Sequence, residues 1–144
     1  MTADRTPGPQ LSGDLRDALV QMSFALMAAL TEVAAEHDLS LTQLRMLGIM
    51  RDREPTMTDL ATYTGLERST VSGLIDRAAR RGLVVKFSHP VDGRSVRVRL
   101  TVRARRLERD VTAAIAERVA PLTGRLNTAE RKRLTTLLNK ALGL

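Results

Sequence analysis

Cysteine is absent from the 144-residue sequence. Its absence excludes disulfide bonds, thiolate nucleophiles, cysteine-ligated zinc and any thiol-based redox sensor, and it is compatible with a reducing cytoplasm. Histidine is also scarce: His37 and His89 are too few and too isolated for a zinc site, which needs about three or four ligands. We therefore expect a protein that works without a metal or another cofactor.

Long apolar runs and an export signal are missing as well. The longest uncharged stretch lies between Asp17 and Glu32, and it is shorter than the ~20 apolar residues that a bilayer span needs. Residues 1–12 lack the basic start and the apolar centre of a signal peptide, and we interpret them as a flexible N-terminal tail. These features predict a cytoplasmic protein that does not enter a membrane.

The residue patterns of common enzyme sites do not occur either. The sequence contains no glycine-rich phosphate loop, no nucleophile beside a base and no convergent pair of carboxylates. We therefore do not expect an enzyme.

Positive charge is what the chain has in excess. The net charge is +7 at pH 7, and the excess is concentrated between residues 67 and 106, where basic residues greatly outnumber Glu67, Asp76 and Asp92. A uniform excess of basic residues could serve solubility alone, whereas concentration in one stretch is typical of a nucleic-acid site. Double-stranded DNA is therefore the partner that we expect.

Apolar periodicity predicts helices near both ends of the chain. Within residues 13–37, apolar residues recur every three or four positions and form the stripe of one helix. The stripe consists of Leu15, Leu19, Met22, Leu26, Leu30 and Val33. A second long helix is expected from Thr101 to about Ala120, before Pro121, and a last helix is capped by Asn127 and Glu130. The apolar face of the last helix is too small to be stable alone, so it must dock on a partner.

Residues 40–100 predict a winged helix-turn-helix. Ser40 and Gln43 form a capping box that opens a helix, and helical segments over 58–64 and 68–81 are separated by a tight turn at Gly65. Alternating residues over 96–100 and a partner strand over 83–87 predict a hairpin, with turn residues and Arg94 at its tip. The segments 13–37 and 101–144 are surplus to such a unit, and we interpret them as dimerisation helices.

Six short blocks, taken together and in order, resemble the MarR family of bacterial regulators. The blocks are Leu39-Ser40-Leu41-Thr42-Gln43, Asp59-Leu60-Ala61, Glu67-Arg68-Ser69-Thr70-Val71-Ser72, Arg81-Gly82-Leu83-Val84, Asp92-Gly93-Arg94-Ser95 and Leu100-Thr101. The resemblance covers roughly residues 12–143, and the collinear set is far more specific than any one block. It implies a single domain over 13–144 that is mainly α with a small β-hairpin wing, a winged helix-turn-helix with N- and C-terminal dimerisation helices.

The resemblance also implies a function. It points to a homodimeric transcriptional repressor that binds a palindromic operator and releases it on binding a small aromatic or apolar acid. The expected DNA-binding residues of the recognition helix are Arg68, Ser69, Thr70, Ser72, Gly73 and Arg77. Those of the wing are Asp92, Arg94 and Arg97. The candidate effector pocket consists of Phe24, Met27, Met46 and Met50, which also suit a hydrophobic core because flexible methionine fills irregular gaps.

Two departures from the family pattern bear on DNA recognition. Gly73 stands where many relatives have an arginine that reads bases, so that contact is missing. The segment Lys86-Phe87-Ser88-His89 replaces a strand that is commonly more basic, which predicts fewer phosphate contacts.

Alternative interpretations remain open at this stage. Ser69 and Thr70 could simply cap and solvate a helix start, Arg94 could be a solvated turn residue, and Arg97 and Arg99 could form a solvated strand face. For the whole protein, the alternatives are a winged helix that assembles with an acidic protein and an architectural DNA binder without an effector.

Overall fold

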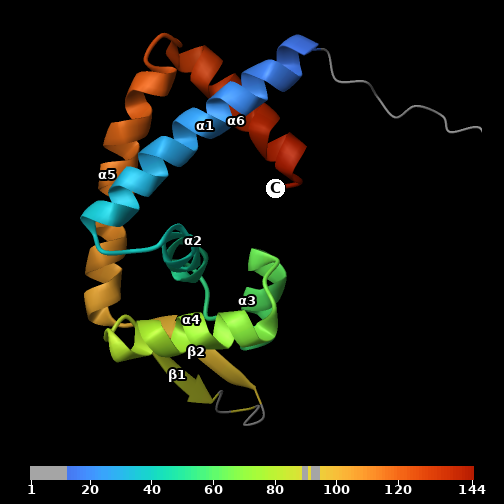
Figure 1. Ribbon diagram of the computed structural model, residues 1–144. Coiled ribbons are helices and arrows are strands. Elements are labelled where there is room, and N and C mark those ends of the chain that lie inside the picture. The colour runs from blue at the N-terminus through green and yellow to red at the C-terminus, as the bar shows by residue number, and fades with distance from the viewer. Residues whose placement is uncertain (1–12, 89–90, 92–94) are drawn as a thin grey trace, which may run out of the picture.

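The computed structural model describes residues 13–88, 91 and 95–144. In these residues the chain forms the helices α1 (Gly13–Glu36), α2 (Leu41–Met50), α3 (Met57–Thr64) and α4 (Arg68–Arg80), the strands β1 (Val84–Ser88) and β2 (Val96–Leu100), and the helices α5 (Val102–Thr123) and α6 (Thr128–Leu142). Figure 1 shows α1 and α6 at one end, α3, α4 and the strands at the other, α2 between them, and α5 running along one side from the strands to the end that carries α6. The predicted fold class, six helices with a two-stranded wing, is confirmed.

Side chains at the helix starts explain where several of the helices begin. Ser40 and Gln43 form the expected capping box at α2, and Asn127 and Glu130 form the one at α6. Thr56 and Asp59 form a third at α3, in which Asp59 Oδ2 accepts from the Thr56 amide at 3.0 Å. Hydrogen bonds from Thr56 lower the pKa of the Asp59 carboxyl below its usual value. A carboxylate at a helix N-terminus also interacts favourably with the helix dipole.

The helix-turn-helix is formed by α3 and α4, joined by a turn at Gly65. Gly65 has φ of 69° and so adopts the left-handed conformation that glycine enters without a steric penalty. The predicted apolar face of α4 is confirmed, because Val71, Leu74, Ile75 and Ala78 are all buried. Helix α4 therefore keeps its polar residues on the opposite, exposed side.

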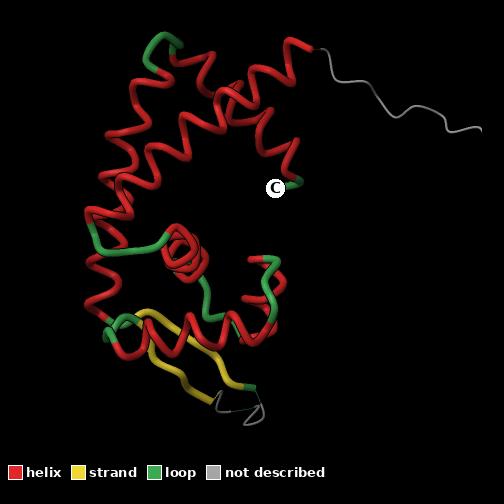
Figure 2. Tube along the Cα trace, in the orientation of Figure 1, coloured by secondary structure: helices red, strands yellow, loops and turns green. Residues whose placement is uncertain are grey.

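The two strands form an antiparallel hairpin that packs below α4 (Figure 2). Val84 pairs with Leu100 and Lys86 with Val98, and the buried members of these pairs join the core. The amide of Val98 also donates to the carbonyl oxygen of Pro55 at 3.0 Å, so β2 is attached to the loop before α3. This attachment fixes the base of the wing relative to the helix-turn-helix.

Helices α1 and α5 pack against each other, and Arg118 on α5 makes ion pairs with Glu32 and Glu36 on α1. The predicted end of α5 before Pro121 was too early, since the helix continues to Thr123. A proline costs one intrahelical hydrogen bond, and the last turn is closed by the Gly124 amide, which donates to the Pro121 carbonyl oxygen at 3.4 Å.

Much apolar surface on α1 and α6 has no partner within one chain. Of the predicted α1 stripe, only Val33 is buried, while Leu15, Leu19 and Met22 are exposed. Helix α6 has no buried residue, and Leu137, Leu138 and Leu142 are all exposed. The predicted helices are thus present, and their apolar faces remain open to solvent in the single chain.

Candidate nucleic-acid interface

The exposed face of α4 carries small polar residues and free arginines. Arg68, Ser69, Thr70 and Arg77 are exposed, and Ser72 is half-buried. No hydrogen bond or ion pair involves the side chains of Arg68 or Arg77 within the part of the chain that the structure describes. Short side chains let a helix approach the major groove closely, and free guanidinium groups can bind phosphates or base edges.

The basic stretch divides into arginines that hold the fold together and arginines that are free. Arg81 Nη1 donates to the Asp38 carbonyl oxygen at 2.7 Å, and Arg103 Nη1 donates to the Arg81 carbonyl oxygen at 3.2 Å. These hydrogen bonds link the turn after α1, the end of α4 and the start of α5. Within the described residues, the side chains of Arg80 and Arg106 make no such hydrogen bonds and remain available to a polyanion.

The only acidic residue within α4, Asp76, is matched by a lysine from the wing. Lys86 Nζ lies 2.5 Å from Asp76 Oδ1, and this ion pair lowers the pKa of the Asp76 carboxyl below its usual value. Neutralising Asp76 reduces its repulsion of phosphates near α4. Lys86, which lies in the wing segment that departs from the family pattern, therefore has an ion-pair partner within the protein.

A cavity of about 290 Å³ lies where α3, α4 and the wing meet. It is lined by Thr56, Met57, Thr58, Arg68, Ser95 and Val96. The first amides of α3 have no partners within the helix, and the N-terminal end of a helix dipole attracts anions. Together with the guanidinium of Arg68, this end of α3 can hold a phosphate group.

Arg97 differs from the outward, basic strand residue that the sequence pattern predicted. It is half-buried, and its Nη1 donates to the Glu54 carbonyl oxygen at 3.0 Å. Arg97 also forms a β-bridge with Thr56, and its buried Nε has no hydrogen-bond partner. Arg97 thus connects β2 to the loop before α3, and at least one donor of its guanidinium is used within the protein.

Arg99 does lie on the exposed face of the wing. Its guanidinium stacks over the Phe87 ring at 4.8 Å from the centroid, so the phenylalanine of the unusual wing segment supports a cation. The other expected wing residues, Asp92 and Arg94, lie outside the described residues.

The comparisons with known proteins agree with this arrangement. A family model described as "MarR family" matches residues 37–95, which include the helix-turn-helix and β1. The homoprotocatechuate degradative operon repressor of Escherichia coli is 26% identical over 129 residues, covering 88% of this chain and 86% of the repressor. The helix-turn-helix region of the chain therefore resembles that of the MarR family.

Two solved structures share the fold over nearly the whole length. Rv1404 from Mycobacterium tuberculosis has a TM-score of 0.79 with 28% identity, covering 93% of this chain and 96% of Rv1404. BpsR of Bordetella bronchiseptica, whose DNA binding is regulated by 6-hydroxynicotinic acid, has a TM-score of 0.73 with 25% identity, covering 96% of this chain and 99% of BpsR. The winged helix-turn-helix and the flanking helices of this chain are therefore shared with both proteins, one of which is a regulated DNA-binding protein.

The chain also has a cavity beside α2, of about 490 Å³ and mainly apolar. Its lining residues are Met27, Leu30, Leu41, Thr42, Leu44, Arg45, Thr64 and Leu66. Met27 is the only one of the four expected pocket residues in this lining. Met46 and Met50 are buried in the core, the favoured interpretation of all four residues, whereas Phe24 is 73% exposed on α1. Phe24 and Met27 are therefore not part of the core of the single chain, because their helix face is not covered there.

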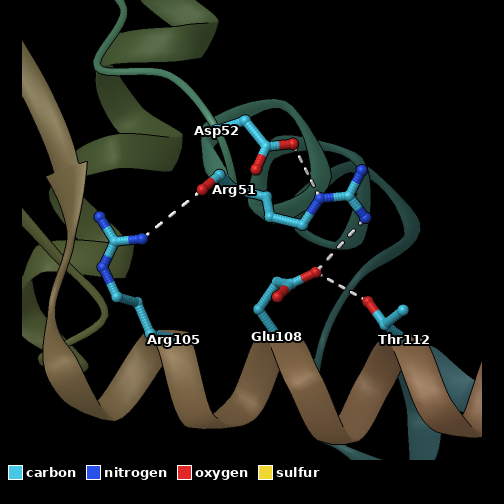
Figure 3. A network of polar contacts seen from close by, with 5 residues as sticks. All are labelled: Arg51, Asp52, Arg105, Glu108 and Thr112. Carbon is cyan, nitrogen blue, oxygen red and sulfur yellow. Dashed lines mark hydrogen bonds and ion pairs between the residues drawn. The ribbon is translucent and has the colours of Figure 1, made fainter.

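A polar network that sequence reasoning missed joins α2 to α5 (Figure 3). Glu108 is buried; its Oε1 lies 3.7 Å from Arg51 Nη1 and accepts from the Thr112 hydroxyl at 2.7 Å. Arg51 Nε also donates to Asp52, and the Arg51 carbonyl oxygen accepts from Arg105 Nη1 at 3.5 Å. Glu108 and Thr112 lie four residues apart on one helix face, but nothing in the sequence indicated that Arg51 would lie opposite. The network connects the flanking helix α5 to the end of α2, next to the helix-turn-helix.

Proposed function

We propose that this chain is a homodimeric repressor of the MarR type that binds a palindromic operator through α4 and the wing. The observation that carries the proposal is the exposed polar face of α4 with its free Arg68 and Arg77, of which Arg68 also lines the cavity at the N-terminus of α3. The relative from Escherichia coli is a repressor, which supports repression rather than activation of transcription here. A repressor of this kind acts by occupying DNA that the transcription machinery would otherwise use.

The dimer is supported by the apolar faces of α1 and α6. Leu19 is 48% exposed, Leu138 is 45% exposed and Leu142 is 71% exposed, an arrangement that is costly in water unless a second surface covers it. By length and composition alone α1 could also cross a membrane, which the sequence pattern had not indicated. Its C-terminal end packs in the core through Val33 and Ala34, and a second copy of the chain is the partner that we propose for the remainder.

A two-fold dimer sets the geometry of the operator. Two recognition helices must lie about 34 Å apart to occupy successive major grooves on one face of the duplex. Because the two copies are related by symmetry, the half-sites should be inverted repeats centred about one helical turn apart.

Binding to the DNA upstream of the protein's own gene tests this proposal. The full-length protein should protect a palindromic segment in a footprint, and affinity should fall steeply with salt because arginines displace counterions from phosphates. We expect a log-log slope on the order of −4 to −8 per dimer. A flat salt titration, or tight binding to an acidic protein in place of DNA, would contradict the proposal.

The cavity beside α2 supports control by a small aromatic or apolar acid. Its wall is mainly apolar, as a ring requires, and Arg45 supplies a cation at its edge, where Nη2 donates to the Tyr63 carbonyl oxygen at 2.9 Å. A carboxylate bound at Arg45 would compete with that hydrogen bond to the end of α3, and so would act on the helix-turn-helix. BpsR, whose DNA binding responds to 6-hydroxynicotinic acid, gives the chemical class to try first.

Calorimetry tests the effector. An acid that binds the free protein better than the DNA complex must lower operator affinity by the same factor, on the order of 5- to 150-fold. Arg45→Gln should weaken the acid, and because it also removes the hydrogen bond to the Tyr63 carbonyl oxygen, it should itself lower operator affinity in the absence of the acid. If a panel of aromatic acids leaves the footprint intact, the regulator works without an effector of this class.

A further inference from the structure

Gly73 lies at the centre of the exposed face of α4. It is four residues after Ser69 and four before Arg77, and residues at this spacing are neighbours along one side of a helix. The buried residues Val71, Leu74 and Ile75 lie on the opposite side. A side chain at position 73 would therefore point directly away from the protein, and glycine leaves that space empty.

The guanidinium of Arg77 lies next to this empty space. A methyl group built on Gly73 would be 3.5 Å from Arg77 Nη1, and it would meet no other atom within 4 Å beyond its own helix surroundings. Long helical side chains lean toward the N-terminus and cover the preceding turn, which is the direction seen here. One turn of helix rises about 5.4 Å, a distance that an arginine side chain can reach.

Nothing else in the described structure uses this guanidinium. Lys86 on the wing is paired with Asp76. Arg68 lies at the N-terminal end of α4, beside the cavity at α3. Among the free arginines of α4 in the described residues, Arg68, Arg77 and Arg80, Arg77 is the one whose guanidinium lies within 4 Å of the empty space at position 73, in the middle of the face that would enter the major groove. Arginine binds guanine through O6 and N7 with two hydrogen bonds, the commonest specific contact in that groove.

We propose that Arg77, reaching across Gly73, is the residue that reads a guanine in each operator half-site. The inference rests on the proposed DNA-binding function and adds which residue discriminates between bases. Position 73 contributes by being empty: a larger side chain there would push the guanidinium away from the centre of the helix face. Arg68, in contrast, binds phosphate and carries no sequence information.

Selection from a random DNA library tests this assignment and defines the operator half-site at the same time. The full-length protein, Arg77→Ala, Gly73→Ala, Gly73→Leu and the control Arg68→Ala are each used to select bound duplexes, which are then sequenced. Affinities for the selected site and for single-base changes are measured by fluorescence anisotropy. Circular dichroism and thermal unfolding establish that each variant is folded.

The wild-type protein should select an inverted repeat with a guanine whose replacement weakens binding on the order of 5- to 150-fold in each half-site. Arg77→Ala and Gly73→Leu should lose that preference while keeping the rest of the site. Gly73→Ala should retain it, because 3.5 Å is an ordinary van der Waals distance for the added methyl. Arg68→Ala should weaken all sequences about equally and make the salt slope shallower by about one for each phosphate that Arg68 no longer neutralises.

Three results would overturn the assignment in whole or in part, and they are distinguishable. If the wild-type protein retains no DNA, the proposed function fails and the assignment fails with it. If Arg77→Ala selects the same repeat with the same guanine preference, DNA binding stands and Arg77 is not the reader. If Gly73→Leu keeps the full preference of the wild-type protein, the empty space at position 73 has no part in base recognition.

Discussion

The winged helix-turn-helix and the α1–α6 end of the molecule differ in how completely they bury their apolar residues. In the DNA-binding region, Leu60, Val71, Ile75 and Val98 are fully buried, and every element packs against others in the same chain. At the other end, α6 buries nothing and the N-terminal half of α1 is open. The first region has a core of its own, whereas the second leaves its apolar faces uncovered in the single chain, so we expect that folding and the proposed dimerisation can be perturbed separately.

The largest effect is expected from a cavity in the first region. Ile75→Ala removes a fully buried side chain and should lower the free energy of unfolding by about 2–5 kcal/mol. Chemical denaturation followed by circular dichroism measures this value. Leu138→Ala, the matched truncation on α6, should affect the midpoint mainly through the dimer, so that its effect depends on protein concentration. Equal, concentration-independent losses in both variants would remove the distinction between the regions.

A charge on α6 should separate the two copies without unfolding either. Leu138→Glu places a carboxylate in the apolar face and should produce monomers in sedimentation velocity. Operator affinity should fall on the order of 100-fold or more, because the second half-site is no longer tethered. Thr136→Glu adds the same charge on the opposite side of α6 and is the control. A Leu138→Glu variant that sediments as a dimer would show that α6 lies outside the interface.

The wing attachment predicts a smaller effect that distinguishes a structural role from DNA binding. Arg97→Ala removes the hydrogen bond to the Glu54 carbonyl and should lower stability by about 1 kcal/mol, with weaker DNA binding as a consequence. Arg99→Ala should leave stability nearly unchanged and reduce the salt dependence of DNA binding. Thermal unfolding and anisotropy on the same samples separate these outcomes. If Arg97→Ala leaves the stability unchanged, Arg97 does not hold the wing in place, and it is a DNA-facing residue instead.

The comparison also explains what could be predicted from the sequence. Local signals were sufficient for the capping box at Ser40, the turn at Gly65 and the apolar face of α4, because each depends on neighbours in sequence. The alternation in β2 was only partly right, since Val96 is exposed and Arg97 is half-buried. The interactions of Arg97 with Glu54 and of Arg51 with Glu108 were missed because they join residues 43 and 57 positions apart. The alternating pattern of β2 predicts which face of the strand carries Arg97, but it does not predict which residues lie against that face. Likewise, Met46 and Phe24 look alike as apolar helix residues, and only tertiary packing separates a core residue from an exposed one.

A glycine in the middle of a helix predicts a modest gain of stability on substitution. Gly73→Ala should raise the free energy of unfolding by about 0.5–1 kcal/mol, because alanine loses less conformational entropy in a helix and its methyl group meets no close neighbour. Gly48→Ala on α2, where no atom lies within 4 Å of an added methyl group, should give a similar gain and serves as the comparison. Denaturation midpoints measure both. A loss of stability at Gly73 alone would show that the Arg77 side chain cannot adjust.

The smallest effect concerns pH and the start of α3, where the helix-turn-helix meets the base of the wing. The pKa of Asp59 is lowered chiefly by hydrogen bonds from Thr56, with a weaker contribution from the positive charge of Arg97. A carboxyl whose pKa is lower in the folded state contributes stability above its unfolded pKa of about 4, and this contribution is lost as the pH falls through the folded value. The free energy of unfolding should therefore decline on acidification below about pH 5.

Asp59→Asn keeps an oxygen acceptor for the Thr56 amide but cannot titrate, so its unfolding free energy should decline less steeply with acid than that of the wild-type protein. Arg97→Ala should also flatten the decline, although less, since Arg97 acts on Asp59 only through its charge. Urea denaturation at a series of pH values between about 2 and 6 measures the difference as the ratio of variant to wild-type slopes. Superimposable pH profiles for wild-type and Asp59→Asn would show that the capping carboxylate does not link protonation to the stability of the helix-turn-helix.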